Sequence, residues 1–412
     1  MTQHGSLIGP SPGRLYVGPL ACYVDAFAAR LRERGYAAHT VSIKLRVVSG
    51  FSRWLERREV LVPALDDKVV ARYLAYRQKR LGRTRHGDPA TLRALMHLLR
   101  EIAMVPAVLP PVDESEAAHV VRDFGQYLTR ERGLSQLTLL ETLPIVRRFL
   151  DGRFRGQPVL LADLCAPDVT TFVLRNAHTK SPGCAKKMVG ALRAFFRFLR
   201  LRGDITIDLA GAVPSVAGWR FSTVPKYIGA AEVERVLGSC DRKTPVGQRD
   251  YAILLLLARL GLRSGEVTAL TLDDIDWEAG ELTVRGKRGR RDRMPIPRDV
   301  GKAMATYLRR GRPPQSLRRV FVRITAPRGG LGASAVGCVV RRALARAGLH
   351  PPHRGAYLLR HSLATQMLRK GASLTEIGEV LRHRLSDTTA IYAKVDFTAL
   401  RDLALPWPGG EP

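Results

Sequence analysis

An internal repeat in the first half of the chain restricts its fold more than any other sequence feature. Placing each residue against the residue 98 positions later aligns two Arg-Glu-Arg-Gly segments, 32–35 and 130–133. Further identities in the same register, without a gap, are Thr40 with Thr138, Leu45 with Leu143, Val48 with Val146, and Phe51 with Phe149. Such self-similarity predicts two copies of one structural unit rather than a single large fold.

Both copies have the periodicity of α-helices. Apolar residues recur three and four positions apart in 21–35 and 39–58, and again in the second copy. Gly35 and Gly133 are placed to end helices, since glycine adopts the left-handed conformation that closes many of them. We therefore expect all-helical units here. The expected division of the whole chain is a flexible arm at 1–15, an N-terminal helical module at 16–110, a second helical module at 113–212, a linker at 213–228, a C-terminal domain at 229–400 and a tail at 401–412.

The C-terminal domain mixes helical and strand patterns. Alternating residues near 281–285 and 292–296 flank a basic turn and predict a β-hairpin, and 318–324 is a candidate third strand. Helical periodicity is present in 230–240, 249–263, 333–348, 361–371 and 373–383. The expected fold class is mainly α with a small β-sheet, an α+β domain preceded by all-helical modules.

The charge of the chain points to a polyanionic partner. The 412 residues contain 67 Lys and Arg against 37 Asp and Glu, a formal net charge of +30. An excess of this size favours nucleic acid as the partner, here double-stranded DNA, although a basic surface without such a role is the alternative. In the segment 185–203, one stripe is apolar and the remaining surface is basic. Lys186, Lys187, Arg193 and Arg197 are our candidates for DNA contacts there, against the alternative of an ordinary solvated face.

The sequence gives little support for a disulfide framework, a metal site or a membrane span. The five cysteines are scattered and contain no Cys-x-x-Cys pair, so neither a disulfide framework nor a zinc site is predicted, and a reducing compartment fits. The longest apolar stretch, 251–258, is far too short for a membrane span. We expect a cytoplasmic, nucleoid-associated protein without metal or cofactor.

Five residues in the C-terminal domain form a candidate site. They are Arg263, Lys287, Arg360, His383 and Tyr392. Taken singly, each has an ordinary structural explanation, such as a surface ion pair or a packed ring. Together, two guanidiniums, an ammonium, an imidazole and a phenol suit the gripping of a phosphodiester and its attack by tyrosine.

The segments LGLRSGEV, VRGKRGRRDRMPIP, YLLRHSLATQML and LRHRLSDTTAIYAKV occur in this order over 225–400. In order and spacing they resemble the catalytic domain of the tyrosine recombinase family, the phage-type integrases of the XerC/XerD kind. The resemblance makes 229–400 the catalytic domain. The upstream units are similar to the family's all-helical DNA-clamping modules, with a SAM-like DNA-binding module at 16–110 and a core-binding module at 113–212. The resemblance implies that Tyr392 attacks the scissile phosphorus, giving a 3′-phosphotyrosine and a free 5′-OH. It also implies that Arg263 and Arg360 hold the non-bridging oxygens.

The resemblance assigns roles to the other site residues as well. Lys287 would protonate the leaving oxygen, His383 would hydrogen-bond the phosphate, and Glu266 would brace the arginines. The sequence departs from the family pattern at two positions. Tyr357 stands where the motif usually has the histidine expected to act as general base, and Arg382 stands where glycine usually precedes the histidine.

A phenol with a pKa near 10 is a poor base at neutral pH. His361 and His353 are close enough in sequence to compensate, although His361, which follows the arginine as in the family, is expected to be structural. Arg382 is a further candidate for DNA contact, or a solvated cation.

The implied function is site-specific DNA recombination. The duplicated N-terminal region makes the chain longer than a minimal recombinase of one clamp and one catalytic domain, which favours integration or transposition of a mobile element. The alternatives are a catalytically weakened DNA-binding partner of the same fold and a relaxing topoisomerase. Similar proteins act as tetramers on DNA, so we expect a homo-tetramer, or a hetero-tetramer with related recombinases. The apolar residues of 400–407 would dock the tail on a neighbouring protomer or on its own domain.

Overall fold

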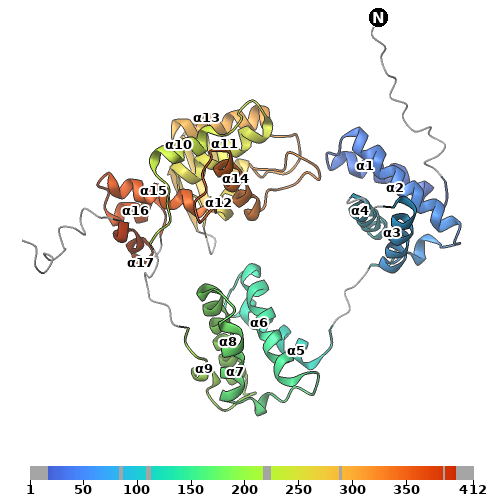
Figure 1. Ribbon diagram of the computed structural model, residues 1–412, viewed down its shortest axis with the longest axis horizontal. Coiled ribbons are helices and arrows are strands. Elements are labelled where there is room, and N and C mark those ends of the chain that lie inside the picture. Colours follow the sequence, from blue (N-terminus) through green and yellow to red (C-terminus); the bar gives the residue numbers. More distant parts are fainter. Residues whose placement is uncertain are drawn as a thin grey trace, which may run out of the picture. The chain divides into compact units, whose positions relative to one another are not determined.

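The computed structural model describes residues 17–82, 87–107, 113–216, 224–286, 290–383 and 386–395 (Figure 1). The chain divides into two compact units: residues 1–107 together with 223–412, and residues 108–222. Three large hydrophobic clusters lie in these units, one in each helical module and one in the C-terminal domain. Among the described helices, none has both the length and the apolar character needed to cross a lipid bilayer.

The N-terminal module is built from helices around an aromatic core. Its main helices are α1 (Val24–Glu33), α2 (Ala38–Glu56), α3 (Asp67–Leu81) and α4 (Gly87–Glu101). Phe51, Trp54 and Tyr73 pack together, with ring centroids 4.8 to 6.2 Å apart. Asp66 starts α3 by accepting a hydrogen bond from the backbone N–H of Val69 at 2.7 Å, the usual role of an N-cap carboxylate.

The second module has a phenylalanine-rich core. Its helices are α5 (Glu116–Arg130), α6 (Gln136–Phe154), α7 (Ala166–Ala177), α8 (Pro182–Arg202) and the short α9 (Leu209–Ala212). Phe149 meets Phe196 edge-to-face at 5.4 Å, and Phe124 meets Phe195 in the same way at 5.3 Å. These rings come from three helices, so the core ties α5 and α6 to α8.

The two modules contain the same order of elements over the repeated segment. Helices α2 and α6 are each 19 residues long, and each is followed by a 3-10 turn and a further helix. Phe51 and Phe149, which the repeat aligns, both lie in their module's core. Gly35 and Gly133 have φ angles of +78° and +57°, so both predicted helix-ending glycines adopt the left-handed conformation.

In the C-terminal domain, α11 lies against α10, α13, α14 and α15 (Figure 1). The run from Ala252 to Ala258 within α11 is fully covered, which explains why it is apolar on every face. The helices are α10 (Ala230–Gly238), α11 (Pro245–Arg259), α12 (Ser264–Ala269), α13 (Arg298–Thr306), α14 (Ala333–Arg346), α15 (Tyr357–Arg369), α16 (Leu374–Val380) and α17 (Ser386–Thr389), with a 3-10 helix at Ala390–Val395.

A three-stranded antiparallel sheet has the order β1 (Ile275–Asp276), β2 (Glu281–Arg285), β3 (Arg291–Pro295). The predicted hairpin is therefore confirmed. The prediction of a strand at 318–324 was wrong, because this segment makes only isolated bridges, Thr271 to Arg319 and Val322 to Gly330. Its apolar residues are in the core, so burial rather than strand pairing explains the pattern.

Candidate active site

Arg360 is the buried centre of the candidate site. It lies in the first turn of α15 and is only 2% exposed. One terminal nitrogen donates to the carbonyl of Gly261 and the other to the carbonyl of Leu381. Arg360 therefore joins the loop that leads to Arg263 with the turn that leads to His383. Burial, followed by repulsion from Arg263 and Arg382, lowers the pKa of Arg360 to about 10.

Glu266 holds two of the arginines. Its Oε1 accepts from Nη1 of Arg263 at 2.6 Å, and its Oε2 accepts from the Arg263 backbone N–H at 2.9 Å and from Nη2 of Arg382 at 2.9 Å. The Glu266 carboxylate is 7% exposed, and these partners hold its pKa below the usual value despite burial. The brace predicted for Glu266 thus has a geometric basis, and it extends to Arg382.

Tyr392 lies in a small cluster with Ala364, Ile377 and Leu381 and is 1% exposed. Its phenol oxygen is 2.8 Å from Nδ1 of His361. Burial raises the pKa of Tyr392 to about 12, while the charges of Arg360 and Arg263 act in the opposite direction. Tyr392, Arg360 and Arg263 are therefore close enough to interact electrostatically, as the sequence-based hypothesis requires.

His383 also lies close to the tyrosine. Its ring is parallel to that of Tyr392, with 2° between planes and 6.4 Å between centroids. Nδ1 of His383 is 2.7 Å from Oγ1 of Thr389, which fixes the ring orientation. Burial, followed by the nearby charge of Arg360, lowers the pKa of His383 to about 4, so the imidazole is neutral at neutral pH.

Two of the predicted site residues, Lys287 and Tyr357, do not lie within this buried cluster of described residues. Lys287 lies outside the described residues, although the strands on either side of it, β2 and β3, are described. Tyr357 is the first residue of α15, and its side chain is 58% exposed. Its ring centroid is 6.0 Å from that of His361, so it borders the site without being buried in it.

The local charge is strongly positive. Arg263 and Arg382 pair with the Glu266 carboxylate, and burial, followed by repulsion from these two arginines, lowers the pKa of Arg360. A phosphodiester anion placed among them would relieve that repulsion. Within the described part of the chain, no group of three or more His, Cys, Asp or Glu side chains is arranged to hold a metal ion.

Comparison with known proteins identifies the family. The sequence model of the phage integrase family matches residues 226–399. A Sinorhizobium fredii protein named as an integrase/recombinase, y4rA, is 47% identical over 394 residues, covering 95% of each chain. The chain belongs to the phage integrase family. The tyrosine recombinase XerD of Mycobacterium tuberculosis is 33% identical over 311 residues, 71% of this integrase-family chain and 97% of XerD.

Solved structures have the same fold at lower identity. The recombinase XerH bound to palindromic difH substrate, in a post-cleavage complex, has a TM-score of 0.57 at 19% identity, covering 72% of this chain and 99% of XerH. A lambda integrase tetramer bound to a Holliday junction has a TM-score of 0.51 at 17% identity, covering 75% of this chain and 87% of that one. The mainly helical fold with a small sheet is that of tyrosine recombinases.

The predicted DNA contacts on α8 lie in different environments. Lys186 and Lys187 are exposed, and Nζ of Lys187 is 2.7 Å from Oε2 of Glu141. Arg193 is half-buried, and its Nη2 donates to the carbonyl of Val213 and to Oγ of Ser215, both at 2.9 Å. These partners leave Lys187 and Arg193 only partly available to a phosphate.

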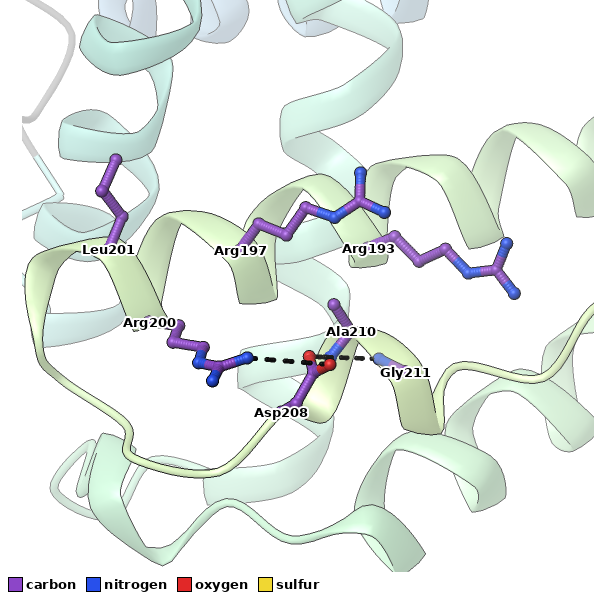
Figure 2. Close-up of a pocket in the computed structure, with 7 residues that line it drawn as sticks. All are labelled: Arg193, Arg197, Arg200, Leu201, Asp208, Ala210 and Gly211. Atoms are coloured by element: carbon purple, nitrogen blue, oxygen red, sulfur yellow. Dashed lines mark hydrogen bonds and ion pairs between the residues drawn. The ribbon is translucent and has the colours of Figure 1, made fainter.

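Figure 2 shows the pocket on α8 that Arg193, Arg197 and Arg200 line, together with Asp208 of the segment before α9. Arg197 is exposed and, among the described residues, has no hydrogen bond or ion pair. Arg200 lies 3.7 Å from the Asp208 carboxylate. The pocket is thus basic, and Arg197 is its most available cation.

Three features of the site were not anticipated from the sequence. His361 contacts the phenol of Tyr392, although the sequence favoured a structural role for it. Thr389, which orients His383, had no sequence signal beyond its short distance from Tyr392. The side chain of Arg382 is 7% exposed and paired with Glu266, so it is not a solvated cation. Contact between Arg382 and DNA stays a prediction.

Proposed function

We propose that the chain cuts and rejoins DNA at specific sites with Tyr392 as nucleophile. The observation that carries the proposal is the convergence of Tyr392 with Arg360 and Arg263, whose charges act on its phenol. The phenol oxygen attacks the scissile phosphorus, and the 5′ oxygen leaves, so that a 3′-phosphotyrosine joins protein and DNA. The phosphate ester conserves the bond energy, and rejoining reverses the same step.

The arginines stabilise the transition state in this proposal. Arg263 and Arg360 hold the non-bridging oxygens, where negative charge increases as the phosphorus becomes five-coordinate. Loss of one such donor costs about 3–4 kcal/mol, or roughly 10²–10³ in rate. Glu266 acts through Arg263, because the hydrogen bond of 2.6 Å from Nη1 of Arg263 to Oε1 of Glu266 orients the guanidinium. His383 hydrogen-bonds the phosphate with the ring nitrogen that does not face Thr389.

Lys287 is the proposed donor of a proton to the leaving 5′ oxygen. A 5′-thio group departs as a thiolate and needs no proton, which provides a test. Lys287→Ala should lose more rate on a 5′-OH leaving group than on a 5′-thio one. Equal losses on both substrates would limit Lys287 to binding the phosphate.

We propose that the chain acts in the integration or transposition of a mobile element. An N-terminal helical module in addition to the second one makes it longer than XerD, of which 97% aligns with only 71% of this chain. Four copies on DNA, identical or mixed with related recombinases, are the proposed assembly, and the nucleoid within the cytoplasm is the proposed location. The lambda integrase tetramer on a Holliday junction supports this assembly by analogy of fold. Lys186, Lys187, Arg193, Arg197 and Arg382 are the proposed DNA contacts.

The test is a covalent adduct on DNA. Nicked duplexes that tile the DNA on either side of the gene would be mixed with the full chain and denatured, and the retained protein–DNA adduct measured. Wild type and Tyr251→Phe, which removes a phenol from α11, should form the adduct, and Tyr392→Phe should form none. Binding to a duplex without any adduct from wild type would instead favour the DNA-binding partner. Relaxation of any supercoiled plasmid by a monomer would favour a topoisomerase.

A further inference from the structure

Tyr357 and His361 lie one helical turn apart on α15, yet they relate differently to the nucleophile. Tyr357 is largely exposed, whereas His361 is half-buried with its Nδ1 2.8 Å from the phenol oxygen of Tyr392. We propose that Nδ1 of His361 accepts the proton of Tyr392 during strand cleavage. The inference rests on the proposed function, because it requires Tyr392 to be the nucleophile.

The arrangement of the rings distinguishes His361 from His383. The His361 ring is tilted by 59° to the Tyr392 ring, with 5.7 Å between centroids, and its nitrogen meets the hydroxyl. The His383 ring lies parallel to the tyrosine and directs Nδ1 to Thr389. Of the hydrogen bonds between described residues, the one that Tyr392 makes is to His361. A base must be within hydrogen-bond reach of the proton that it removes, and His361 is.

The helix accounts for the position of the imidazole. Residues four apart on a helix share a face, so His361 and Tyr357 project from the same side of α15. Position 357 carries a phenol in place of the imidazole that the family resemblance leads one to expect. His361 therefore supplies an imidazole from the same face, one turn further into the domain and in direct contact with the reacting oxygen.

The protonation states agree with this role. Burial, followed by the charge of Arg360, lowers the pKa of His361, so the imidazole is neutral and can accept at Nδ1 when Nε2 carries the hydrogen. Burial raises the pKa of Tyr392 to about 12, so the phenol keeps its proton until attack begins. A nearby acceptor is needed because the proton becomes acidic only as the oxygen bonds to phosphorus.

The step balances without a further reagent. As the Tyr392 oxygen forms its bond to phosphorus, the phenol proton moves to Nδ1 of His361, which becomes an imidazolium. The bond from phosphorus to the 5′ oxygen breaks, and that oxygen takes its proton from the separate acid proposed above. In rejoining, a 5′-OH attacks the phosphotyrosine and returns its proton to that same acid, which has been left deprotonated, while the imidazolium returns its proton to the leaving phenolate. The incoming phosphate offsets the charge of Arg360 and so favours the imidazolium.

The competing explanation is that His361 only packs against Tyr392. The experiment uses the full chain and the nicked duplex that gives the wild-type adduct. Single-turnover cleavage rates would be measured from pH 5.5 to 9 for wild type, His361→Ala, His361→Asn and Tyr357→Phe. His350→Asn, which changes an exposed histidine of the same domain, is the matched control. Melting temperature and binding to the same duplex would be measured in parallel.

We expect His361→Ala and His361→Asn to bind the duplex while losing cleavage rate by about 10²–10⁴-fold, the usual contribution of a general base. Added imidazole should restore part of the rate of His361→Ala but not of Tyr392→Phe. Full rates and an unchanged pH profile in both His361 variants would overturn the proposal, as would a loss confined to Tyr357→Phe. Absence of an adduct from wild type would instead count against the proposed function.

A measurement on the wild-type protein remains decisive if the His361 variants do not fold. Nitrogen NMR of the full chain labelled at its histidines distinguishes the two neutral imidazole tautomers. We expect the hydrogen of His361 on Nε2, which leaves Nδ1 free to accept. A hydrogen on Nδ1 would make His361 a donor to the phenol and would overturn the proposal.

Discussion

Arg382 has a φ angle of +55° and still directs Nη2 to within 2.9 Å of the Glu266 carboxylate. The backbone conformation is one that favours glycine, the residue expected at this position from the resemblance to the tyrosine recombinase family. The arginine therefore keeps the local backbone shape and adds a second cation to a buried carboxylate. Two variants separate these effects.

Arg382→Ala loses the ion pair and keeps the unfavourable backbone conformation, whereas Arg382→Gly loses the ion pair and relieves the conformation. We expect both to lower the free energy of unfolding. Arg382→Ala should be the less stable by about 1–2 kcal/mol, the cost of the left-handed conformation for a residue with a side chain. Urea denaturation of the full chain checks the order. An Arg382→Gly variant more stable than wild type would show that the ion pair contributes less to stability than relief of the backbone conformation does.

Gly261 is a position where an added side chain would disturb the site. Its φ angle is +57°, and an added Cβ would lie 2.6 Å from Cδ2 of Leu381. Gly261→Ala should lower the free energy of unfolding by about 2–4 kcal/mol, from backbone strain and crowding together. Gly265→Ala is the matched control, since a Cβ there meets nothing within 4 Å and it lies in α12. Equal melting temperatures for the two variants would contradict the expectation.

Thr389 should affect cleavage through His383. Thr389→Val preserves the shape of a buried residue and removes the hydroxyl 2.7 Å from Nδ1 of the histidine. We expect roughly a fivefold loss in cleavage rate, as for one hydrogen bond of about 1 kcal/mol, with DNA binding unchanged. Thr389→Ser retains the hydroxyl and should recover most of the rate. A serine variant as slow as the valine variant would assign the effect to packing.

Stability should fall on the acidic side of neutrality. The ordinary pKa of His383 is 6.5, and the folded protein lowers it to about 4. Between these values the unfolded chain binds a proton that the folded chain does not, so stability is lost as pH falls from 6.5 to 4. His361 acts in the same direction. The melting temperature should depend less on pH over this range in His383→Asn, and an unchanged slope would contradict the prediction.

Arg197 should contribute to DNA affinity without regard to sequence. Arg197→Ala should weaken binding to all duplexes alike and reduce the slope of log affinity against log salt by about 1. Arg153→Ala is the control, because Arg153 in the same unit is already paired with Asp168 at 2.8 Å. An equal effect of the two substitutions would mean that Arg197 has no contact of its own.

The local pattern of apolar, polar and glycine residues was enough to predict many of the helices and strands. The hairpin at 281–285 and 291–295 follows from alternation on either side of a basic turn, and the helix-ending role of Gly35 and Gly133 from their position. The segment 318–324 was mistaken for a strand because its buried residues resemble one. Its true neighbours, such as Thr271, are distant in sequence.

The contacts within the site were harder to predict because they join distant segments. Arg382 and Glu266 are 116 residues apart, and no local rule connects them. His361 and Tyr392 are 31 residues apart, with α16 and α17 between them. Sequence spacing identified which residue types belong together, whereas only the folded chain shows which nitrogen faces which oxygen.

The two hydrogen bonds from Arg360 to backbone carbonyls have a consequence for genetic screens. Removing Arg360 would leave the carbonyls of Gly261 and Leu381 without that donor, and buried unpaired groups of this kind destabilise a protein by about 1–3 kcal/mol each. In a growing cell such a loss reduces the amount of intact protein, because proteases remove unfolded chains. Proteins inactivated by substitution of Arg360 should therefore be present in cells in low amounts. Inactive Tyr392→Phe protein should instead accumulate normally and compete with active copies of the protein.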